Sequence, residues 1–322
     1  MGRFYSAIIP LYNRPDEIDE LLESLTHQSY THFEVVVIED GSSDDAKAIV
    51  ESYSNQLTIQ YHYKENEGQG FARNYAFEKA KGEYFVILDS DAVIPPQYFE
   101  EVEKALNANY VDLFGGPDAA QDSFTDLQKA ISYSMTSLFT TGGIRGNKKH
   151  VGTFHPRSFN MGVSRKAWEK VGGFAITRMG EDIEYSIRII KAGFKSALIP
   201  KAFIYHKRRT SLHQFYRQLH FFGRARINIS RFYPDQLKLI HTFPMGFVMA
   251  FTISFLLLFF THHLGRLAMA FFVLYYLAIA IDSTLKNKSA KIGLLSVATS
   301  FTQLWAYGIG FISEGWVKLT KG

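Results

Sequence analysis

Apolar and polar positions in the first part of the chain follow two alternating patterns. Short runs rich in β-branched and aromatic residues predict strands at 4–12, 33–40, 57–64 and 83–91. Between them, apolar residues recur every three or four positions, which predicts helices at 15–28, 44–54 and 70–82. Gly82 is expected to cap the last of these helices. This alternation predicts an α/β fold with a mostly parallel sheet that helices cover on both faces.

The ends of the predicted strands carry polar residues, a proline and a glycine. In an open parallel sheet the carboxyl ends of the strands share one edge, and ligands bind in the crevice beside it. We therefore expect a binding site at this edge. The residues at or just beyond these strand ends are Pro10, Tyr12, Glu39, Asp40, Gly68, Asp89, Ser90 and Asp91.

The last third of the chain shows another pattern, namely three apolar runs without charge at 243–260, 267–281 and 292–312. A helix needs roughly 20 apolar residues to cross a bilayer, so the first and third runs suffice and the second needs its flanks. Buried core helices are the alternative, and the third run could instead be re-entrant or interfacial. We expect a transmembrane region at 241–322 with two to three helices.

The formal net charge of +4 hides an asymmetry along the chain. Residues 1–184 contain 28 acidic and 17 basic residues, a net of −11, and the remainder contains 3 and 18, a net of +15. The segment 185–234 has 11 Lys or Arg and no acidic residue. Such a block is typical of proteins that bind nucleic acid, anionic lipid or phosphate. Because apolar runs follow it, we expect membrane lipids and no nucleic acid as partners, with basic interfacial helices at 206–240.

Loop charges predict the orientation in the membrane, because cytoplasmic loops carry more Lys and Arg. The predicted loop 282–291 holds three lysines, whereas 261–266 holds only Arg266. We expect a multi-pass protein of the inner, cytoplasmic membrane, with its N-terminal domain, 1–205, in the cytoplasm. Three spans would place the C-terminus outside, which the lysines near that end oppose.

The carboxylates of Asp89 and Asp91 suit a hard divalent cation, Mg²⁺ or Mn²⁺, bound together with a diphosphate. Such a cation makes the diphosphate a better leaving group. Asp40 can accept a hydrogen bond from a pyrimidine base, Tyr12 can pack against a base, and Arg73 can reach a base or a phosphate. For each residue alone, a turn, a helix cap, a core aromatic or a solvated face is the alternative. The chain has no cysteine, which excludes a cysteine-ligated zinc site.

Three stretches, in this order, resemble family-2 glycosyltransferases with the GT-A fold. They are IIPLYNRPDEIDELLESLTHQSYTHFEVVVIEDGSSDD, NEGQGFARNYAFEKAKGEYFVILDSD and FNMGVSRKAWEKVGGFAITRMGEDIEYSIRIIKAGFK, and the resemblance covers residues 4–225. The similar enzymes are membrane-bound bacterial proteins that build exopolysaccharide or glycolipid. The resemblance implies an inverting, metal-assisted transfer of a sugar from a nucleotide-sugar donor.

The resemblance also implies roles on the donor side of the site. Asp89 and Asp91 match the DxD motif, which holds the metal and the diphosphate. Glu39 and Asp40 match the acidic pair that recognises the base, and Arg73 matches the arginine that follows the Gly-rich turn. The residues implied in nucleotide-sugar binding are Pro10, Tyr12, Glu39, Asp40, Gly68, Arg73, Asp89, Ser90 and Asp91.

Glu181 and Asp182 match the ED motif, whose aspartate is the general base of inverting transfer. Such a transfer is a single displacement that needs one base for the acceptor hydroxyl and a metal on the leaving group. The sequence EDIEYSIRIIKAG predicts a helix that begins at this pair, and its dipole favours the charged form of Asp182. An ordinary acidic first turn is the alternative.

Later positions are implied to complete the site. His206, after the apolar strand ALIPKAFIYH, would complete the metal shell or touch the diphosphate, and an interfacial histidine is the alternative. Asn160 lies near the acceptor side in the family. Arg208 and Arg209 would contact phosphates of donor or acceptor, or lipid headgroups. The Gly-rich segment 142–158 is predicted to be a mobile acceptor loop.

We therefore predict a hexosyltransferase-like enzyme with a membrane-associated acceptor such as a lipid-linked saccharide. Processive synthases carry QxxRW, but here Gln218 follows Arg217 in place of tryptophan, which favours transfer of a single sugar. The alternatives are a polyprenyl-phosphate glycosyl synthase and an inactive sugar-nucleotide-binding membrane scaffold. A transporter is disfavoured because the centres of the apolar runs lack charge. UDP is the commoner donor nucleotide in the family, with dTDP or GDP as alternatives.

Overall fold

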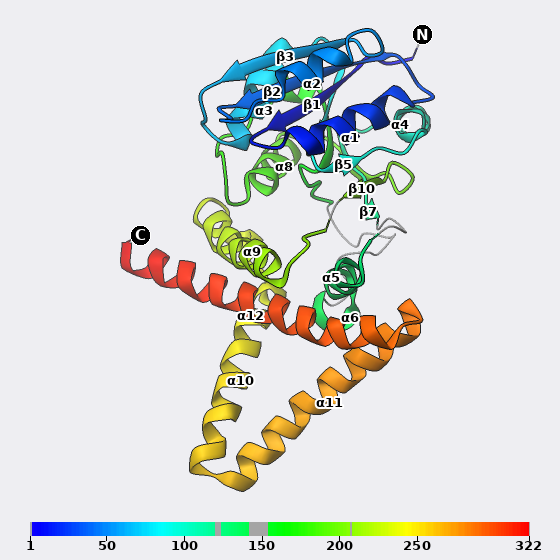
Figure 1. Ribbon diagram of the computed structural model, residues 1–322. Helices are drawn as coiled ribbons and strands as arrows, with labels where there is room; N and C mark the ends of the chain where they lie inside the picture. The colour runs from blue at the N-terminus through cyan, green and yellow to red at the C-terminus, as the bar shows by residue number, and fades with distance from the viewer. Residues whose placement is uncertain (1, 120–123, 142–153, 207, 322) are drawn as a thin grey trace. The chain divides into compact units, whose positions relative to one another are not determined.

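The chain forms two compact units that interleave along the sequence (Figure 1). The computed structural model describes residues 2–119, 124–141, 154–206 and 208–321, except for the side chain of His206. The first unit comprises Met1–Ala119 and Lys148–Lys207, and the second comprises Ala120–Asn147 and Arg208–Gly322.

The first unit is built on a mixed seven-stranded sheet and a small three-stranded sheet. Their strands are β1 (Tyr5–Leu11), β2 (Phe33–Asp40), β3 (Ile59–Lys64), β4 (Tyr84–Leu88), β5 (Ala92–Val93), β6 (Leu113–Gly115), β7 (Asp118–Ala119), β8 (Asn160–Ser164), β9 (Ser196–Leu198) and β10 (Ile204–His206). The large sheet has the order β3-β2-β1-β4-β8-β6-β9, and the small one has the order β5-β10-β7. The strands β3, β2, β1 and β4 are parallel, whereas β8 is antiparallel to both of its neighbours.

Helices cover both faces of the large sheet and bury its alternating apolar side chains. They are α1 (Pro15–Thr26), α2 (Lys47–Ser52), α3 (Gln69–Lys79), α4 (Tyr98–Ala108), α7 (Arg165–Val171) and α8 (Glu181–Lys191). Ile9 of β1 packs in the core under α1, α2 and α4, whereas its neighbour Ile8 packs in the core under α3, α7 and α8. The predicted α/β fold, with a mostly parallel sheet covered on both faces, is confirmed.

The predicted cap at Gly82 is wrong. The helix α3 ends at Lys79, and its C-cap is Ala80 in an extended conformation. Gly82 lies instead against β1, where its N–H donates to Ser6 Oγ at 2.8 Å. A Cβ at position 82 would lie 2.6 Å from the Ser6 nitrogen, so glycine is needed for this close approach and not for the helix end.

The apolar run ALIPKAFIYH was expected to form one strand, but it forms two. The strand β9 ends at Leu198, and β10 begins at Ile204 after a turn. They also belong to different sheets, since β9 pairs with β6 and β10 pairs with β5 and β7. Pro200 lies in the intervening turn, where its ring disfavours continued strand pairing.

The second unit is helical. Its elements are α5 (Asp126–Thr136), α6 (Leu138–Thr141), α9 (Leu212–Phe232), the 3₁₀ turns Pro234–Gln236 and Leu239–Thr242, α10 (Phe243–Phe260), α11 (His262–Asn287) and α12 (Ala290–Lys321). The buried Glu314 of α12 accepts hydrogen bonds from Arg224 and Arg231 of α9, both at 3.0 Å. The buried Glu314 carboxylate takes its counter-charge from these two arginines, so the Arg–Glu–Arg group holds α9 on α12.

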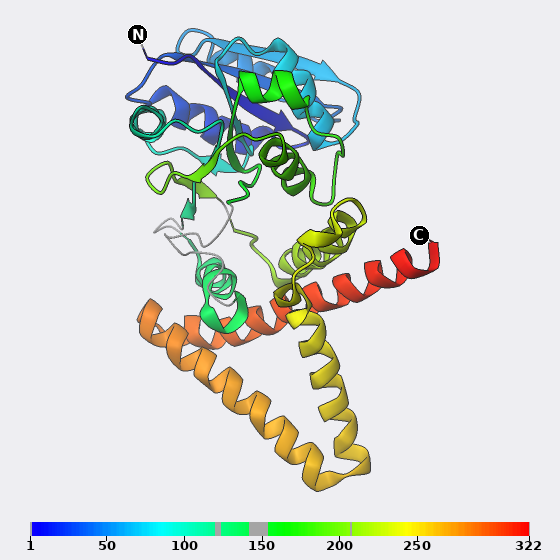
Figure 2. The same cartoon turned by 180° about the vertical axis from the view of Figure 1, so that it is seen from behind.

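Two helices of the described chain are long and apolar enough to cross a membrane, Leu239–Phe260 and His262–Asn287. They include α10 and α11, which are joined at Thr261 and form a hairpin (Figure 2). Only 17% of the most apolar stretch of each is buried, so large apolar side chains such as Phe259 and Leu274 are exposed. A buried core helix does not expose such a surface, so this pattern favours a membrane-associated hairpin.

The third apolar run is different. It lies within α12, whose inward-facing residues include Ser296, Thr299 and Ser300, all fully buried. Ser134 of α5 makes hydrogen bonds with Thr299 and Ser300, so this polar stripe is used for helix packing. Two helices are thus long and apolar enough to cross a membrane, and α12 is not among them; the predicted two to three spanning helices stay a prediction.

Candidate active site

The carboxyl ends of β1, β2 and β4 share one edge of the large sheet. Leu11 of β1 is opposite Glu39 of β2, and β4 ends at Leu88, immediately before Asp89. Within the first unit, the parallel strands thus bring together residues that are far apart in sequence. One of them, Asp89, is joined through Arg73 of α3 (Gln69–Lys79) to Glu181, at the start of α8, and these three side chains form a network of ion pairs.

Arg73 lies at the centre of this network. Its side chain is 1% exposed, and its two terminal nitrogens contact two carboxylates, Asp89 Oδ1 at 3.1 Å and Glu181 Oε1 at 3.4 Å. Its guanidinium also lies over the ring of Phe174, 5.5 Å from the ring centre. The buried cation therefore links the turn after β4 to the start of α8, two segments expected to act on opposite sides of the reaction.

Glu181 and Asp182 begin α8, as predicted, and point to different partners. The N-cap Gly180 has a left-handed backbone with φ +100, which glycine adopts without strain. Glu181 is buried and accepts from Gln69 Nε2 and Arg73. Asp182 is more accessible, with Oδ1 3.5 Å from Arg157 Nη1 and Oδ2 accepting from the Ser158 N–H at 3.4 Å. The accessible carboxylate is therefore that of Asp182.

Burial raises the pKa of Glu181 above its ordinary value of 4.5, and the neighbouring charge of Asp182 raises the pKa further, whereas Arg73 opposes the shift. Between 4.5 and this raised pKa the folded protein holds a proton that the unfolded chain has lost. The free energy of unfolding is therefore expected to fall as the pH rises through this window. Glu181→Gln should flatten that decline, which denaturation midpoints measured from pH 4.5 upward would test. An equally steep decline in the variant would contradict this assignment.

The two carboxylates of the LDSD turn differ in exposure. The side chain of Asp89 is 33% exposed and pairs with Arg73. The side chain of Asp91 is 6% exposed and pairs with Arg14, whose Nη1 lies 3.1 Å from Asp91 Oδ2. Both carboxylates are thus balanced by an arginine in this structure. Ser90, between them, is buried.

The donor set at this turn fits a hard divalent metal. The described residues contain no group of three or more His, Asp or Glu placed to hold a metal ion. Two carboxylates are nevertheless what Mg²⁺ commonly takes from a protein when diphosphate oxygens complete its shell. His206 is paired through its backbone with Ala92, next to Asp91. Its side chain lies outside the described part of the structure, so its role as a ligand stays a prediction.

The acidic pair at the end of β2 is buried and holds the surrounding loops. Glu39 accepts from Ser42 Oγ and from the Ala46 N–H at 3.0 Å, and burial raises its pKa. Its immediate role is therefore to fix the loop after β2.

Asp40 holds the glycine turn that precedes α3. It accepts from the N–H of Glu67 at 3.1 Å and of Gly68 at 2.9 Å, and Lys64 Nζ lies 3.1 Å from its Oδ1. Gly68 has φ +93, and a Cβ there would lie 2.3 Å from Thr177 Oγ1. In this structure Asp40 therefore organises the glycine turn. Its contact with a base stays a prediction.

The other predicted donor residues lie at the end of β1. Pro10 is half-buried within the strand, whereas Tyr12 follows it and is 51% exposed. An exposed aromatic ring at the strand-end edge is available to stack on a base, because little of its surface is used in the core.

The residues predicted on the acceptor side belong to different units. Asn160 is buried, accepts from Tyr98 OH at 2.6 Å and donates to the Ala202 carbonyl at 2.8 Å, so its amide joins parts of the first unit. Arg208 and Arg209 belong to the second unit, so their contact with phosphates or lipid stays a prediction. Most of the predicted acceptor loop, 142–153, lies outside the described residues.

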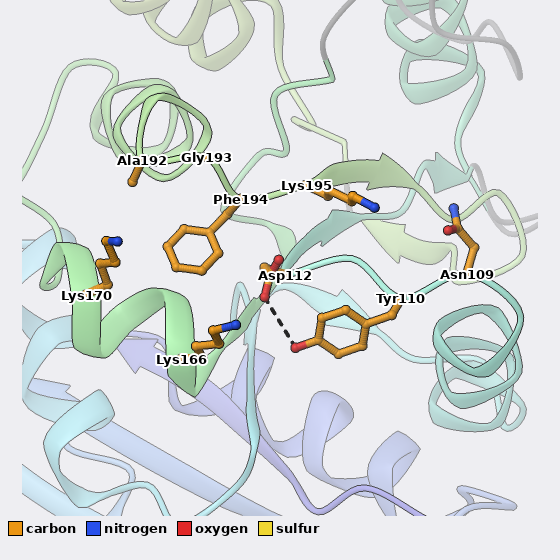
Figure 3. Close-up of a pocket in the computed structure, with 9 residues that line it drawn as sticks. All are labelled: Asn109, Tyr110, Asp112, Lys166, Lys170, Ala192, Gly193, Phe194 and Lys195. Atoms are coloured by element: carbon orange, nitrogen blue, oxygen red, sulfur yellow. Dashed lines mark hydrogen bonds between the residues drawn. The ribbon is translucent and has the colours of Figure 1, made fainter.

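A pocket of about 550 Å³ is lined by residues that do not belong to this network. Figure 3 shows its lining side chains. Lys166 and Lys170 of α7, Lys195 and Asp112 are among its lining residues. The pocket adjoins the C-terminal end of α8, whereas Glu181 and Asp182 lie at the other end of that helix. It is therefore separate from the strand-end site.

Sequence reasoning missed three partners of the predicted residues, which are Arg14, Gln69 and Arg157. Arg14 contacts Asp91, Gln69 contacts Glu181, and Arg157 contacts Asp182. Each is a polar residue in a loop or a first helical turn, so neither hydrophobic periodicity nor spacing distinguished it from a solvated side chain.

The family model described as "Glycosyl transferase family 2" matches residues 6–172, just over half of the chain. Among curated relatives, the Staphylococcus aureus poly(ribitol-phosphate) beta-N-acetylglucosaminyltransferase TarS is 36% identical over 163 residues, covering 44% of this chain and 28% of TarS. The glycosyltransferase AglE of Haloferax volcanii is 30% identical over 207 residues, covering 59% of this chain and 62% of AglE. The first relatives are matched over only 12% to 31% of their own length.

A solved structure of similar fold is the mannosyltransferase PcManGT of Pyrobaculum calidifontis in complex with GDP-Man and Mn²⁺. The superposition has a TM-score of 0.62 at 20% identity and covers 98% of this chain and 88% of that one. At this identity the likeness shows a shared fold, and GT-A is thereby supported as the fold of the first unit.

Proposed function

The chain belongs to glycosyl transferase family 2, and we propose that it transfers a sugar, with inversion, from a nucleoside-diphosphate sugar to a membrane-associated acceptor. The observation that carries this proposal is the Arg73 bridge. One buried arginine contacts both Asp89 of the predicted DxD motif and Glu181 of the predicted ED motif. Two motifs expected to bind the leaving group and the acceptor are therefore parts of one network, as a single displacement requires.

On the donor side, Asp89 and Asp91 would hold a divalent metal and Tyr12 would stack on the base. The metal, when bound, would neutralise the diphosphate as it leaves. A metal is supported by the donor set and by the Mn²⁺ complex of PcManGT. We propose a UDP-sugar as donor, with GDP- and dTDP-sugars as the alternatives.

On the acceptor side, Asp182 would take the proton of the attacking hydroxyl. It lies in the first turn of α8, and its side chain is 15% exposed, against 5% for that of Glu181. Arg157 would hold the carboxylate in position, because its Nη1 lies 3.5 Å from Oδ1.

We further propose that α10 and α11 anchor the chain in the cytoplasmic membrane. Both are apolar and mostly exposed. Lysines lie in the last turn of the second helix, at position 286, and just after it, at positions 288 and 291. A hairpin of two spans returns the chain to its starting side, so the basic α12 end would be cytoplasmic as well. This differs from the outside C-terminus expected for three spans. A membrane anchor supports an acceptor that is itself in the membrane, such as a lipid-linked saccharide.

The test uses detergent-purified full-length protein with UDP-, GDP- and dTDP-sugars and with Mg²⁺ or Mn²⁺. Nucleotide release that needs the metal and increases with a membrane lipid extract is expected. Release unchanged by the extract would contradict the lipid-linked acceptor. Metal-dependent nucleotide binding without any release would favour an inactive sugar-nucleotide-binding scaffold.

A further inference from the structure

Arg14 is paired with a proposed metal ligand but has no part in the mechanism above. Its Nη1 lies 3.1 Å from Asp91 Oδ2, and the Asp91 side chain is almost fully buried. The same nitrogen lies 2.7 Å from Oε2 of Glu17, in the first turn of α1. One guanidinium nitrogen thus joins the buried carboxylate of the LDSD turn to a partly exposed carboxylate.

The two arginines that balance the LDSD carboxylates differ in their freedom to move. Arg73 is 1% exposed and is held by Glu181 as well as Asp89, so it stays in place. The Arg14 side chain is 37% exposed, and its second partner Glu17 is 33% exposed. The exposed Arg14–Glu17 pair contributes little free energy, whereas the buried Asp91 carboxylate would be costly to leave without a positive charge. Arg14 can therefore leave Asp91 at small cost only when a bound cation takes its place.

The backbone before Arg14 is held by hydrogen bonds of Asn13, so only the side chain of Arg14 would move. Asn13 has a left-handed backbone with φ 52. Its Oδ1 accepts from the N–H groups of Ser43 at 2.9 Å and Asp44 at 3.2 Å, and its own N–H donates to Ser42 Oγ at 2.7 Å. The loop after β1 is thereby tied to the loop after β2.

We propose that Arg14 is a positioning residue that holds the Asp91 carboxylate in the absence of metal and transfers to Glu17 when metal and nucleoside diphosphate bind together. This inference rests on the metal-assisted function proposed above. A cation alone must displace the positive charge of Arg14 from Asp91. A cation with a diphosphate brings compensating negative charge, so each of the two strengthens the binding of the other.

The test is direct measurement of Mn²⁺ affinity by electron paramagnetic resonance on the full-length protein, with and without UDP. Arg14→Gln removes the competing charge, so it should bind Mn²⁺ alone about fivefold more tightly than the wild type. Glu17→Gln removes the second partner and leaves Arg14 to Asp91, so it should bind Mn²⁺ alone more weakly. In Arg14→Gln, UDP should increase the Mn²⁺ affinity by a smaller factor than in the wild type.

Arg14→Gln and Glu17→Gln are expected to change the Mn²⁺ affinity in opposite directions. This difference distinguishes the positioning role of Arg14 from a purely structural one. If Arg14 only supported the fold, both variants would weaken Mn²⁺ binding and lower the denaturation midpoint, which would overturn the inference. A third variant, Asp91→Asn, distinguishes failure of the Arg14 inference from failure of the proposed metal-assisted function. Loss of Mn²⁺ binding in Asp91→Asn with wild-type affinity in Arg14→Gln would refute the Arg14 inference alone. Wild-type Mn²⁺ affinity in Asp91→Asn would refute the metal site itself.

Discussion

Asp182→Asn is expected to lower the rate of sugar transfer by roughly 10² to 10⁴-fold, the range that a general base contributes. The asparagine keeps the size of the side chain and its acceptor oxygen toward the Ser158 N–H, but it cannot take a proton from the acceptor hydroxyl. Binding of the nucleotide should be nearly unchanged, because Asp182 is proposed to act on the acceptor side. Single-turnover rates and nucleotide affinity, measured on the same preparation, give the two readouts.

Glu184→Gln is the matched control for Asp182→Asn. Glu184 is another acidic residue in the first turn of α8, but its carboxylate pairs with Arg188 at 2.8 Å on the same helix. The control therefore removes a similar charge from the same helix end, and it should keep the transfer rate of the folded enzyme. A similar fall in rate in both variants would show that charge at the helix end matters and not a base at position 182.

The size of the Asp182→Asn effect also bears on the acceptor. A lipid phosphate is already ionised and needs little help from a base, whereas a sugar hydroxyl must lose its proton. A loss of less than tenfold would therefore favour a polyprenyl-phosphate glycosyl synthase over transfer to a lipid-linked saccharide.

Arg73→Met is expected to cost about 3 kcal/mol of stability and to abolish transfer. Methionine fills much of the same space, but it leaves the buried Glu181 without its cation, and losing one partner of a buried ion pair is strongly destabilising. Asp89 would lose its partner as well. Denaturant-induced unfolding in detergent measures the stability, and nucleotide release measures the activity.

Arg165→Met is the control for Arg73→Met. Arg165 also lies over an aromatic ring, that of Phe85, but it donates to the backbone carbonyls of Gly82 and Ala80 rather than to carboxylates. Its loss leaves no charge unpaired, so we expect a cost of about 1 kcal/mol and unchanged transfer by the folded protein. Equal stability losses in the two variants would contradict the special role of the Arg73 bridge.

Much of the fold follows from local patterns in the sequence. The strand expected at 33–40 from the apolar run at 35–38 appears as β2 over those residues, with every one of them buried. The helix expected at 15–28 appears as α1, with its leucines buried and Pro15 at its start. These predictions succeed because a side chain's exposure depends mainly on its position in the period of its own strand or helix.

Sequence patterns gave incomplete predictions where a glycine or an apolar run can serve more than one structural role. Gly82 was expected to end a helix, but it is needed for its close approach to Ser6. The run at 292–312 was long enough for a membrane span, yet α12 buries Ser296 and Thr299 against other helices. Composition cannot distinguish these structural roles, because each depends on which part of the chain packs against the residue in the folded protein.

The sequence by itself determined the order of the first four strands and of the helices between them, the strand ends where the predicted binding residues lie, and the family of the chain. Only the tertiary structure decided which side chains meet there. Arg73 and Glu181 are 108 positions apart, and Arg14 and Asp91 are 77 apart. Neither contact follows from spacing, because the order of strands in the sheet and the start of α8 bring these residues together. The physical reason is that a buried charge must find a partner wherever the fold places one, and the chain's local pattern carries no information about that place.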